Sequence, residues 1–520
     1  MSSSLSSQVP IPSMRSSSAG PLPLEVCREA SGNMATDNRG KAHFVGLGGQ
    51  GMRSLAMLMV GAGWQVSGSD LSSQACGELK ALGLDVKVGH AAANLPLDVD
   101  EVVHSAAIGE HNLELVAARR LGVPVLSYAE ALARRLAGRD LIAVAGTHGK
   151  STTTAMVAEI LIRSGLDPSV VCGADPIRSE HGVLNNQHHD EESSLKQHTI
   201  NSIAEGPEFR SSGRFGRGEL AVAEACEYQR HFLQLRPRWA TITGIEADHF
   251  DCYRDAAELS EAFRQFASRL DRTGILVRAE HCSTAAAAAE SAACRVESFG
   301  ESPHADWQAD RLGRVRGCAK FSLRYRGEHL ANVRLRVPGR HNVHNALAAA
   351  ALAFHAGVEV PRVVSGLEAF RGIRRRLEWI GDRRGISIWE DYAHHPTEIS
   401  ASLTTLREIF PDRRLCVLFQ PHQESRTRHL LDPLAASLKD ADILAITTIF
   451  RARESETQES RISAADLAAA VRRRGTEVIP EHDLECLKHW IRRTCRPGDV
   501  LVTMGAGDLS AKCHEYTNWI

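Results

Sequence analysis

The stretch "LIAVAGTHGKSTTTAMVAEIL", residues 141–161, constrains the fold more than any other part of the chain. An apolar run leads into a glycine turn, and a run of good helix formers follows at once. A strand, a tight turn and a helix in this order predict a parallel α/β unit, in which helices cover the faces of the sheet. The backbone N–H groups of such a turn, together with the positive end of the following helix, favour a bound phosphate.

The turn also carries the side chains that a phosphate site uses. Lys150 can bring a full charge to the terminal phosphates of a nucleotide, and Ser151 can bind Mg²⁺. The usual pattern G-x-x-x-x-G-K-[ST] would place glycine at 144, where this chain has Val144, so the loop is a variant. An ordinary glycine turn before a helix is the alternative. We favour a nucleotide triphosphate site built from Gly146, Thr147, His148, Gly149, Lys150, Ser151 and Thr152.

Length and composition indicate a multidomain globular protein. With 520 residues, and roughly 150 residues per domain, the chain should contain about three domains. The net charge of -2 gives no electrostatic reason to expect nucleic acid or an anionic membrane as a partner. No apolar run approaches the roughly 18 residues that span a bilayer, and we expect a cytoplasmic location. The 12 cysteines contain no Cys-x-x-Cys pair, so neither a zinc site nor a disulfide framework is indicated.

Changes of character along the chain suggest the domain boundaries. Residues 1–38 are rich in Ser and Pro and read as a disordered tail. Residues 39–138 open with "KAHFVGLGGQGM" and alternate strands with helices, as in a Rossmann-like domain. Residues 139–370 contain the phosphate loop and a polar, His-rich insert at about 178–217, which we expect to be a mobile surface loop. Residues 371–520 read as a third α/β domain.

The first glycine turn, "GLGGQGM", is less specific than the phosphate loop. It fits a pyrophosphate at a helix N-terminus, and by itself it would suggest a nicotinamide dinucleotide. Asp70 ends the second strand about 20 residues further on, where an acid can bind a ribose diol.

Acidic residues and a histidine follow two further apolar strands. A magnesium site beside the phosphate loop needs such ligands at the carboxyl ends of neighbouring strands. A single carboxylate at a strand end is more often a helix cap, but together with the loop these residues favour a metal site. The stretch "LAVAEACEY" supplies Glu224 and Glu227, and "ATITGIEADHFDCY" supplies Glu246, Asp248, His249 and Asp251.

Nine motifs then occur in a recognisable order. They are "HFVGLGGQGM", "AGTHGKSTTT", "AEACEY", "IEADHFD", "PGRHNVHNALAA", "FRGIRRRLE", "EDYAHHPTE", "FQPHQESRTR" and "MGAGD". From about Lys41 to its end, the chain resembles the Mur ligases of peptidoglycan synthesis, and within them the members that attach L-alanine. The resemblance implies the fold class α/β with three domains: an N-terminal Rossmann-like UDP-binding domain, a central P-loop-type ATPase domain with a mixed sheet, and a C-terminal Rossmann-like domain that binds the amino acid.

The resemblance also implies a reaction. Family members use ATP and Mg²⁺ to convert a substrate carboxylate into an acyl phosphate, which an amine then attacks. The expected substrates here are UDP-N-acetylmuramate and an amino acid, with L-alanine as the leading candidate. We expect no nucleic acid or membrane partner, and a monomer or weak homodimer.

Family roles can be assigned to matching positions of this sequence. The catalytic residues would be Lys150, His249 and Arg376, and the metal ligands Ser151, Glu224 and His249. The remaining ATP contacts would be His341 and Asn345 at the adenine, Arg376 at the phosphates and Asp391 on the third domain; the last two require domain closure. UDP-sugar contacts would be Gly46, Gly48, Gly49, Gly51, Met52, Ser69, Asp70 and Ser105. Amino-acid contacts would be Tyr392, His394, His395 and Arg426.

One departure from the family pattern leaves the incoming amine open. Members that attach L-alanine commonly read "QPHRYTRTR", whereas this chain has Gln423 in place of the first arginine. A neutral amide cannot clamp a carboxylate as a guanidinium does. Another amino acid or a recycled peptide is therefore an alternative substrate. A non-catalytic UDP-sugar-binding homologue is a second alternative, while a dinucleotide oxidoreductase would leave the phosphate loop without a use.

Overall fold

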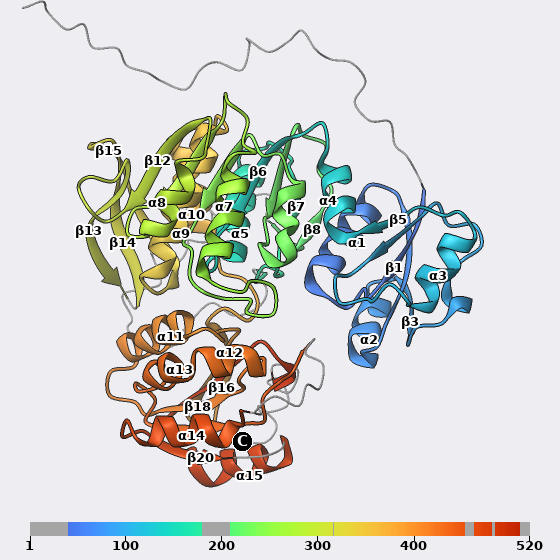
Figure 1. The fold of residues 1–520 in the computed structure, drawn as a ribbon. Coiled ribbons are helices and arrows are strands. Elements are labelled where there is room, and N and C mark those ends of the chain that lie inside the picture. Colours follow the sequence, from blue (N-terminus) through green and yellow to red (C-terminus); the bar gives the residue numbers. More distant parts are fainter. Residues whose placement is uncertain (1–39, 179–208, 316, 453–461, 481–483, 510–520) are drawn as a thin grey trace, which may run out of the picture.

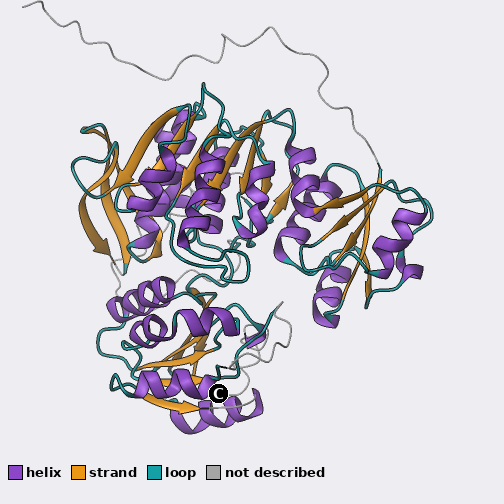
Figure 2. Ribbon diagram, in the orientation of Figure 1, coloured by secondary structure: helices purple, strands orange, loops and turns teal. Residues whose placement is uncertain are grey.

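The computed structural model describes residues 40–178, 209–315, 317–452, 462–480 and 484–509, and it contains three separate sheets. Figure 1 shows the first sheet at one side of the molecule, the large central sheet beside it and the third sheet below the central one. Helices cover the sheets, as Figure 2 shows. The predicted three-domain α/β architecture is confirmed. The predicted tail at 1–38 lies outside the described residues.

The N-terminal sheet is wholly parallel, with strand order β3-β2-β1-β4-β5. The change of direction in strand order beside β1 places the carboxyl end of β1 at a crevice, which is where open α/β sheets bind ligands. Its strands are β1 (Lys41–Val45), β2 (Gln65–Asp70), β3 (Asp85–Val88), β4 (Glu101–His104) and β5 (Val125–Ser127). Its helices are α1 (Gln50–Gly61), α2 (Ser73–Ala81), the short η2 (Ala92–Asn94), α3 (Leu113–Arg120) and α4 (Tyr128–Leu136).

The central sheet is mixed, with strand order β15-β14-β13-β12-β11-β10-β6-β9-β7-β8. Strands β10, β6 and β9 are adjacent and parallel, so their carboxyl ends share one edge. The strands are β6 (Asp140–Ala145), β7 (Ser169–Val171), β8 (Gly213–Arg214), β9 (Leu220–Glu224), β10 (Trp239–Ile242), β11 (Ile275–Ala279), β12 (Arg295–Gly300), β13 (Trp307–Val315), β14 (Cys318–Tyr325) and β15 (Glu328–Pro338). The helices are α5 (Lys150–Arg163), η4 (Tyr228–Gln234), α7 (Ala256–Ala267), α8 (Ser283–Ala289), α9 (His341–His355) and α10 (Val360–Ala369).

The C-terminal sheet has strand order β16-β17-β21-β18-β19-β20, and only the β16–β17 pair is antiparallel. Its strands are β16 (Glu378–Arg383), β17 (Ile386–Asp391), β18 (Leu415–Phe419), β19 (Ile443–Ile446), β20 (Glu477–Pro480) and β21 (Val500–Met504). Its helices are α11 (Pro396–Ile409), α12 (Glu424–His429), α13 (Leu431–Ser437), α14 (Ala464–Arg472) and α15 (Leu484–Thr494).

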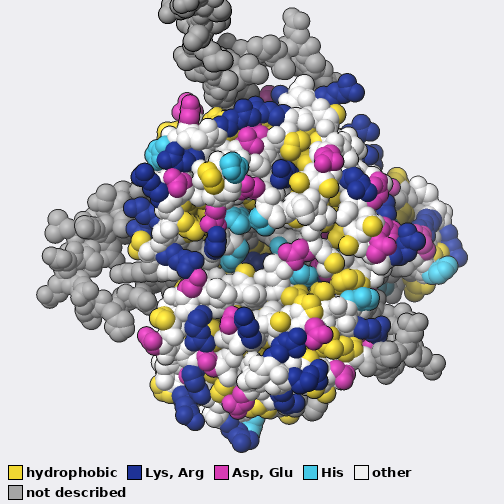
Figure 3. Space-filling view, turned by 60° about the vertical axis from the view of Figure 1, so that its left-hand side comes forward, with side chains coloured by type: hydrophobic (Ala, Val, Ile, Leu, Met, Phe, Trp, Pro, Cys, Tyr) yellow, Lys and Arg dark blue, Asp and Glu magenta, His cyan; other side chains and the backbone are white. Residues whose placement is uncertain are grey.

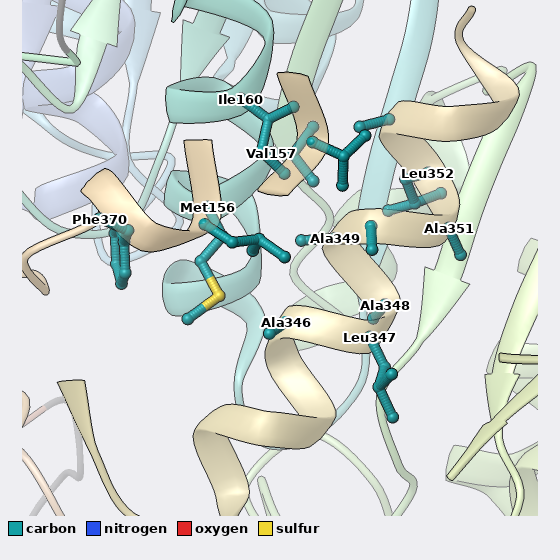
Figure 4. Packing of buried hydrophobic residues seen from close by; sticks show 14 of the residues in the cluster. Met156, Val157, Ile160, Ala346, Leu347, Ala348, Ala349, Ala351, Leu352 and Phe370 are labelled. Carbon is teal, nitrogen blue, oxygen red and sulfur yellow. The ribbon is translucent and has the colours of Figure 1, made fainter. Parts of the chain in front are cut away.

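The packing of α5 against α9 fixes the geometry of the phosphate loop. Figure 4 shows Met156, Val157 and Ile160 of α5 among the alanines of α9, and these side chains are fully buried. Because alanine side chains are small, the two helices can approach each other closely. α5 begins at Lys150 and α9 begins at His341, so this contact holds the start of one helix beside the start of the other.

One end of the predicted insert differs from expectation. Residues 179–208 lie outside the described residues, but residues 209–217 are not a surface loop. Phe209 is buried and its N–H donates to Glu159 at 2.8 Å, while Gly213 and Arg214 form the edge strand β8, antiparallel to β7. A strand of only two residues leaves no alternating pattern in the sequence, so periodicity missed it.

Strand β8 also joins the N-terminal domain to the central one. Helix α1 packs against β7 and β8, and the Ser54 hydroxyl donates to the carbonyl of Cys172 at 2.7 Å. A Cβ atom on Gly213 would lie 1.9 Å from the backbone oxygen of Ser54, so only glycine permits this approach. Throughout the part of the chain that the structure describes, no helix combines the length and the apolar character needed to cross a bilayer.

Candidate active site

The phosphate loop turns sharply between β6 and α5 with two glycines in the left-handed region. Gly146 has φ +128° and Gly149 has φ +78°. A Cβ atom on Gly146 would lie 2.8 Å from the Thr243 nitrogen, and one on Gly149 would lie 2.4 Å from Asn345 Oδ1. Both glycines are therefore required by conformation and by space. The loop places Asn345 of α9 directly against the N-terminus of α5.

Lys150 is the first residue of α5, and its ammonium group folds back over the loop. Nζ donates to the carbonyl of Gly146 at 2.6 Å and of Thr147 at 3.1 Å, and it lies 3.0 Å from Glu227 Oε2. Burial alone would lower the pKa of Lys150, but the charge of Glu227 raises it above its ordinary value. Glu227 is buried, and its pKa is lowered because Lys150 and His249 outweigh the effect of burial. The lysine is thus a fixed cation.

Ser151 and Glu224 converge on one small space beside Gly173. The Gly173 N–H donates to Glu224 Oε2 at 2.8 Å. A Cβ atom on Gly173 would lie 2.5 Å from Glu224 Oε2 and 2.9 Å from Ser151 Oγ, so any larger residue would fill the space between the two oxygens. A hydroxyl and a carboxylate that face the same space are the oxygen donors that Mg²⁺ prefers. These residues fit the predicted magnesium ion.

His249, the third predicted metal ligand, lies against a different carboxylate. Its Nε2 is 3.3 Å from Glu227 Oε1, and the residue has a φ of +56°. Because Glu227 also binds Lys150, one buried carboxylate holds two of the predicted catalytic residues. The structure brings Lys150, Glu227 and His249 together, and it brings Ser151 and Glu224 together.

A cavity of about 1040 Å³ extends from the phosphate loop to the C-terminal domain. Such a volume is at the upper end of the range for pockets that hold a nucleotide-sized ligand. Figure 3 shows several histidine side chains gathered near the middle of the face turned toward the viewer. The predicted ATP-site residues that line the cavity are His148, Gly149, Ser151, Thr152, His341, Asn345, Arg376 and Asp391.

The start of α9 presents one histidine with an unused ring nitrogen. His341 Nδ1 is buried and makes no hydrogen bond to another described residue. Burial, with a smaller effect from the charge of Arg376, lowers the pKa of His341 to about 4, so the imidazole is neutral. Asn345, one turn further on, accepts from the Thr153 hydroxyl at 3.3 Å and donates to Asn342 at 3.0 Å. A neutral imidazole with an unused ring nitrogen can form a hydrogen bond with the base of a nucleotide.

Two predicted residues at or near the first two strands of the C-terminal domain line the cavity. Arg376 lies 3.2 Å from Glu398 Oε1 and packs over the ring of Tyr392. Asp391 ends β17 and accepts hydrogen bonds from the Ala393 N–H at 3.0 Å and from the hydroxyl of Ser402. Burial raises the pKa of Asp391 to about 6. Both residues line the same cavity as the phosphate loop in this structure.

In the N-terminal domain, Asp70 supports the first glycine turn. Its carboxylate accepts from the Gly48 N–H at 2.7 Å and from the Ser72 N–H at 2.9 Å. Gly46 has φ +82°, and a Cβ atom there would lie 3.0 Å from Ser105 Cβ. Ser69 is fully buried below the turn, where its hydroxyl donates to Glu114 at 2.8 Å.

The other predicted UDP contacts form the start of α1. Gly49 is the N-cap residue of the helix, and the side chain of Met52 is buried. A Cβ atom on Gly51 would lie 3.0 Å from the ring of Tyr128. The turn therefore brings the predicted residues to one place, although Ser69 faces the interior.

The predicted amino-acid residues are gathered at the contact between the central and C-terminal domains. Arg426 does not face open space: its Nη2 lies 2.7 Å from Asp248 Oδ1, its Nε donates to the same oxygen at 2.8 Å, and its Nη1 lies 2.8 Å from His422 Nδ1. The side chains of Arg426 and Asp248 are 3% and 6% exposed. Burial alone would raise the pKa of Asp248, but Arg426 holds it well below its usual range. This arginine joins the two domains.

The three aromatic residues of the same set lie nearby. The ring of Tyr392 packs against His394, with centroids 5.3 Å apart, and burial lowers the pKa of His394 to about 4. His395 is directed at the central domain, where its Nε2 lies 3.3 Å from the carbonyl of Ala247.

Glu398, which is not among the residues predicted from the sequence, is central to this contact. Its carboxylate accepts from Nδ1 of His148 at 3.2 Å and from Arg376 at 3.2 Å. Burial alone would raise its pKa, but His394 and Arg376 hold it well below its usual range. The signal was present in "HHPTE", where an acid stands in the first turn of a helix that has proline at its first position.

A phosphate loop on a mixed central sheet, flanked by a parallel N-terminal sheet and a C-terminal α/β domain, defines a three-domain nucleotide-dependent ligase. The sequence comparisons agree. Residues 41–139 match the Mur ligase family catalytic domain, residues 144–353 the Mur ligase middle domain, and residues 375–507 the Mur ligase glutamate ligase domain. The chain belongs to the Mur ligase family.

Relatives extend over nearly the whole chain. UDP-N-acetylmuramate--L-alanine ligase of Acetivibrio thermocellus is 35% identical, over 90% of this chain and 93% of the relative. The Aquifex aeolicus enzyme of the same name is 36% identical, over 92% and 97%. Among solved structures, UDP-N-acetylmuramate-alanine ligase of Thermotoga maritima has a TM-score of 0.72 at 26% identity, covering 92% of this chain and 99% of that one. A murein peptide ligase of Psychrobacter arcticus has a TM-score of 0.67 at 25% identity, covering 92% and 98%.

Proposed function

We propose that this chain is an ATP-dependent ligase that joins L-alanine to the carboxylate of UDP-N-acetylmuramate through an acyl phosphate, in peptidoglycan precursor synthesis. The single observation that carries the proposal is the phosphate loop, where His148, Gly149, Ser151 and Thr152 line a cavity of about 1040 Å³ and Glu224 faces Ser151 across Gly173. The relatives named for this reaction, which match nearly the whole chain, support the choice of substrates. A cytoplasmic location is part of the proposal, since the reaction draws on ATP.

The proposed chemistry depends on charge neutralisation. A carboxylate is a weak nucleophile that must approach a polyanion, so fixed cations around the transferred phosphoryl group lower the barrier. Lys150 is held charged by Glu227 and would exchange its carbonyl partners on the loop for phosphate oxygens. Magnesium bound by Ser151 and Glu224, with His249 as the third proposed ligand, would neutralise further charge on the phosphates.

Exclusion of water is the second requirement, because water competes with the amine for the acyl phosphate. Arg376 and Asp391 lie on the wall of the same cavity as the loop and the start of α9. The ion pair between Asp248 and Arg426 holds the C-terminal domain against the central one. We assign Arg376 to the phosphates, Asp391 to the nucleotide ribose, and His341 and Asn345 to the adenine.

The experiment that tests the function is ADP release by the full chain. It is measured with UDP-N-acetylmuramate and with L-alanine, glycine, L-serine or a muramyl-type tripeptide as the amine. The proposal expects release that depends on both the UDP-sugar and L-alanine. Nucleotide hydrolysis that none of the amines stimulates would contradict it.

The recycled-peptide ligase is a second candidate. It is favoured by Gln423, which stands where L-alanine ligases commonly carry arginine, and by the likeness to the Psychrobacter arcticus murein peptide ligase. Gln423 is buried and has φ +67°, with its N–H donating to the Phe450 carbonyl at 2.8 Å. Preference for the tripeptide over L-alanine in the ADP-release assay would establish this candidate in place of the first.

A further inference from the structure

Three side chains at the contact between the central and C-terminal domains have the arrangement of a transition-metal site. They are His148 of the phosphate loop, Glu246 of the loop after β10, and His395 at the start of α11. One ligand atom from each lies within 4.8 Å of the others, and among the described residues this is the one such group of three. It shares no residue with the proposed magnesium site.

The distances between the ligand atoms are close to those around a bound ion. Glu246 Oε2 lies 3.5 Å from His148 Nε2 and 3.7 Å from His395 Nδ1. Ligand atoms that surround a tetrahedral ion at about 2.1 Å are roughly 3.4 Å apart. The two imidazole rings are 4.6 Å apart between centroids, and small ring rotations would bring the third pair of atoms into range.

In each histidine, one ring nitrogen contacts a neighbouring oxygen acceptor and the other ring nitrogen faces Glu246. His148 Nδ1 lies 3.2 Å from the Glu398 carboxylate, and His395 Nε2 lies 3.3 Å from the Ala247 carbonyl. Metal-binding histidines commonly donate one ring N–H to a carboxylate or a carbonyl, because this fixes the tautomer that directs a lone pair at the ion. In both residues the remaining nitrogen is the one that faces Glu246.

Two further observations support a ligand at this place. His148 Nε2 is buried and makes no hydrogen bond to another described residue, and the side chain of His395 is 5% exposed. The Thr397 hydroxyl donates to Glu246 Oε2 at 2.5 Å, which fixes the orientation of the carboxylate. The competing partner is the Thr397 N–H, which donates to His395 Nδ1 at a long 3.4 Å.

We propose that His148, Glu246 and His395 bind a divalent transition-metal ion, such as Zn²⁺ or Co²⁺, that fastens the C-terminal domain to the central domain. Two imidazoles among three ligands suit such ions, whereas Mg²⁺ is held mainly by oxygen ligands and keeps several of its waters. Since His148 and Glu246 also line the nucleotide cavity, the ion would stand in the cavity wall at the domain contact. The inference does not depend on the proposed function.

Without an ion, the group is held by charge. Burial alone would lower the pKa of His148, but Glu246 and Glu398 raise it to about 9.

The test is a Co²⁺ titration of the full chain, prepared without a histidine tag and kept in excess Mg²⁺. The expected result is one Co²⁺ per chain, seen by visible d–d absorption. Glu246→Gln and His395→Gln should each weaken binding at least about tenfold. The control is His111→Gln, at an exposed histidine of the N-terminal domain, which should change the affinity less than about twofold.

Several outcomes would overturn the inference. They are equal Co²⁺ affinity in Glu246→Gln and the parent chain, a strong thiolate absorption that assigns the ion to cysteine, or no saturable binding at all. Anomalous scattering from a Zn²⁺-soaked crystal of the parent chain is the second measurement. Because it uses no variant, its result does not depend on whether a variant folds. An ion found away from Glu246 Oε2 would refute the site.

Discussion

The buried ion pair between Asp248 and Arg426 gives the sharpest prediction about how the domains are held together. Each side chain is nearly fully buried, and the two belong to different domains. Removing one partner of a buried pair leaves an uncompensated charge, which costs about 3–5 kcal/mol. This corresponds to roughly a hundredfold to several thousandfold in an equilibrium constant.

The structure also indicates which equilibrium should change. The C-terminal domain has its own core clusters, which share no residue with those of the central domain. Separation of the two domains returns the unpaired charge to water without disturbing either core. Arg426→Met should therefore favour domain opening by the magnitude above, while the unfolding of each domain changes little.

Hydrogen exchange of the backbone amides in residues 248–253 and in α12 measures this opening. A double-mutant cycle of Asp248→Asn and Arg426→Met should show a coupling of at least about 2 kcal/mol. Arg473→Met, at an exposed arginine at the end of α14 in the same domain, is the control and should leave exchange unchanged. Additive single effects, or equal effects in the control, would refute the reasoning.

Four further predictions concern the loop and its surroundings. Lys150→Ala should abolish ADP release while UDP-N-acetylmuramate binding, followed by calorimetry, persists, since the two glycine turns belong to different domains; loss of both would contradict the assignment of the sites. Gly173→Ala should raise the Mg²⁺ concentration needed for half-maximal ADP release at least about tenfold, because the new Cβ atom would enter the space between two oxygens. Gly109→Ala, whose Cβ atom would meet nothing within 4 Å, should leave that concentration unchanged. Gln423→Arg should lower the KM for L-alanine far more than the KM for ATP, and equal changes would remove the carboxylate-clamp interpretation. Because the folded pKa of His148 is raised to about 9 from 6.5, its contribution to domain contact is full below pH 6.5 and is lost as the pH rises through 9. The equilibrium constant for domain contact should then fall by at most about tenfold per pH unit. Hydrogen exchange of the α11 amides that stays constant over this pH range would contradict the prediction.

The sequence by itself determined the local chemistry. Gly146, Gly149 and Lys150 predicted a phosphate loop from their spacing alone, and the positive φ of both glycines fits that prediction. The strand-end position of Glu224 likewise predicted an oxygen ligand beside the loop, since β9 and β6 are parallel neighbours. These features depend on residues close together in the chain.

Only the tertiary structure decided which distant groups meet. The pairing of Arg426 with Asp248 joins residues 178 positions apart, and Glu398 contacts His148, which is 250 positions away in the sequence. No periodicity encodes such contacts, because they arise from how two separately folded domains lie against each other. The sequence predicted most of the candidate site residues, and the packing of the domains determined which of them line the cavity and which contact one another.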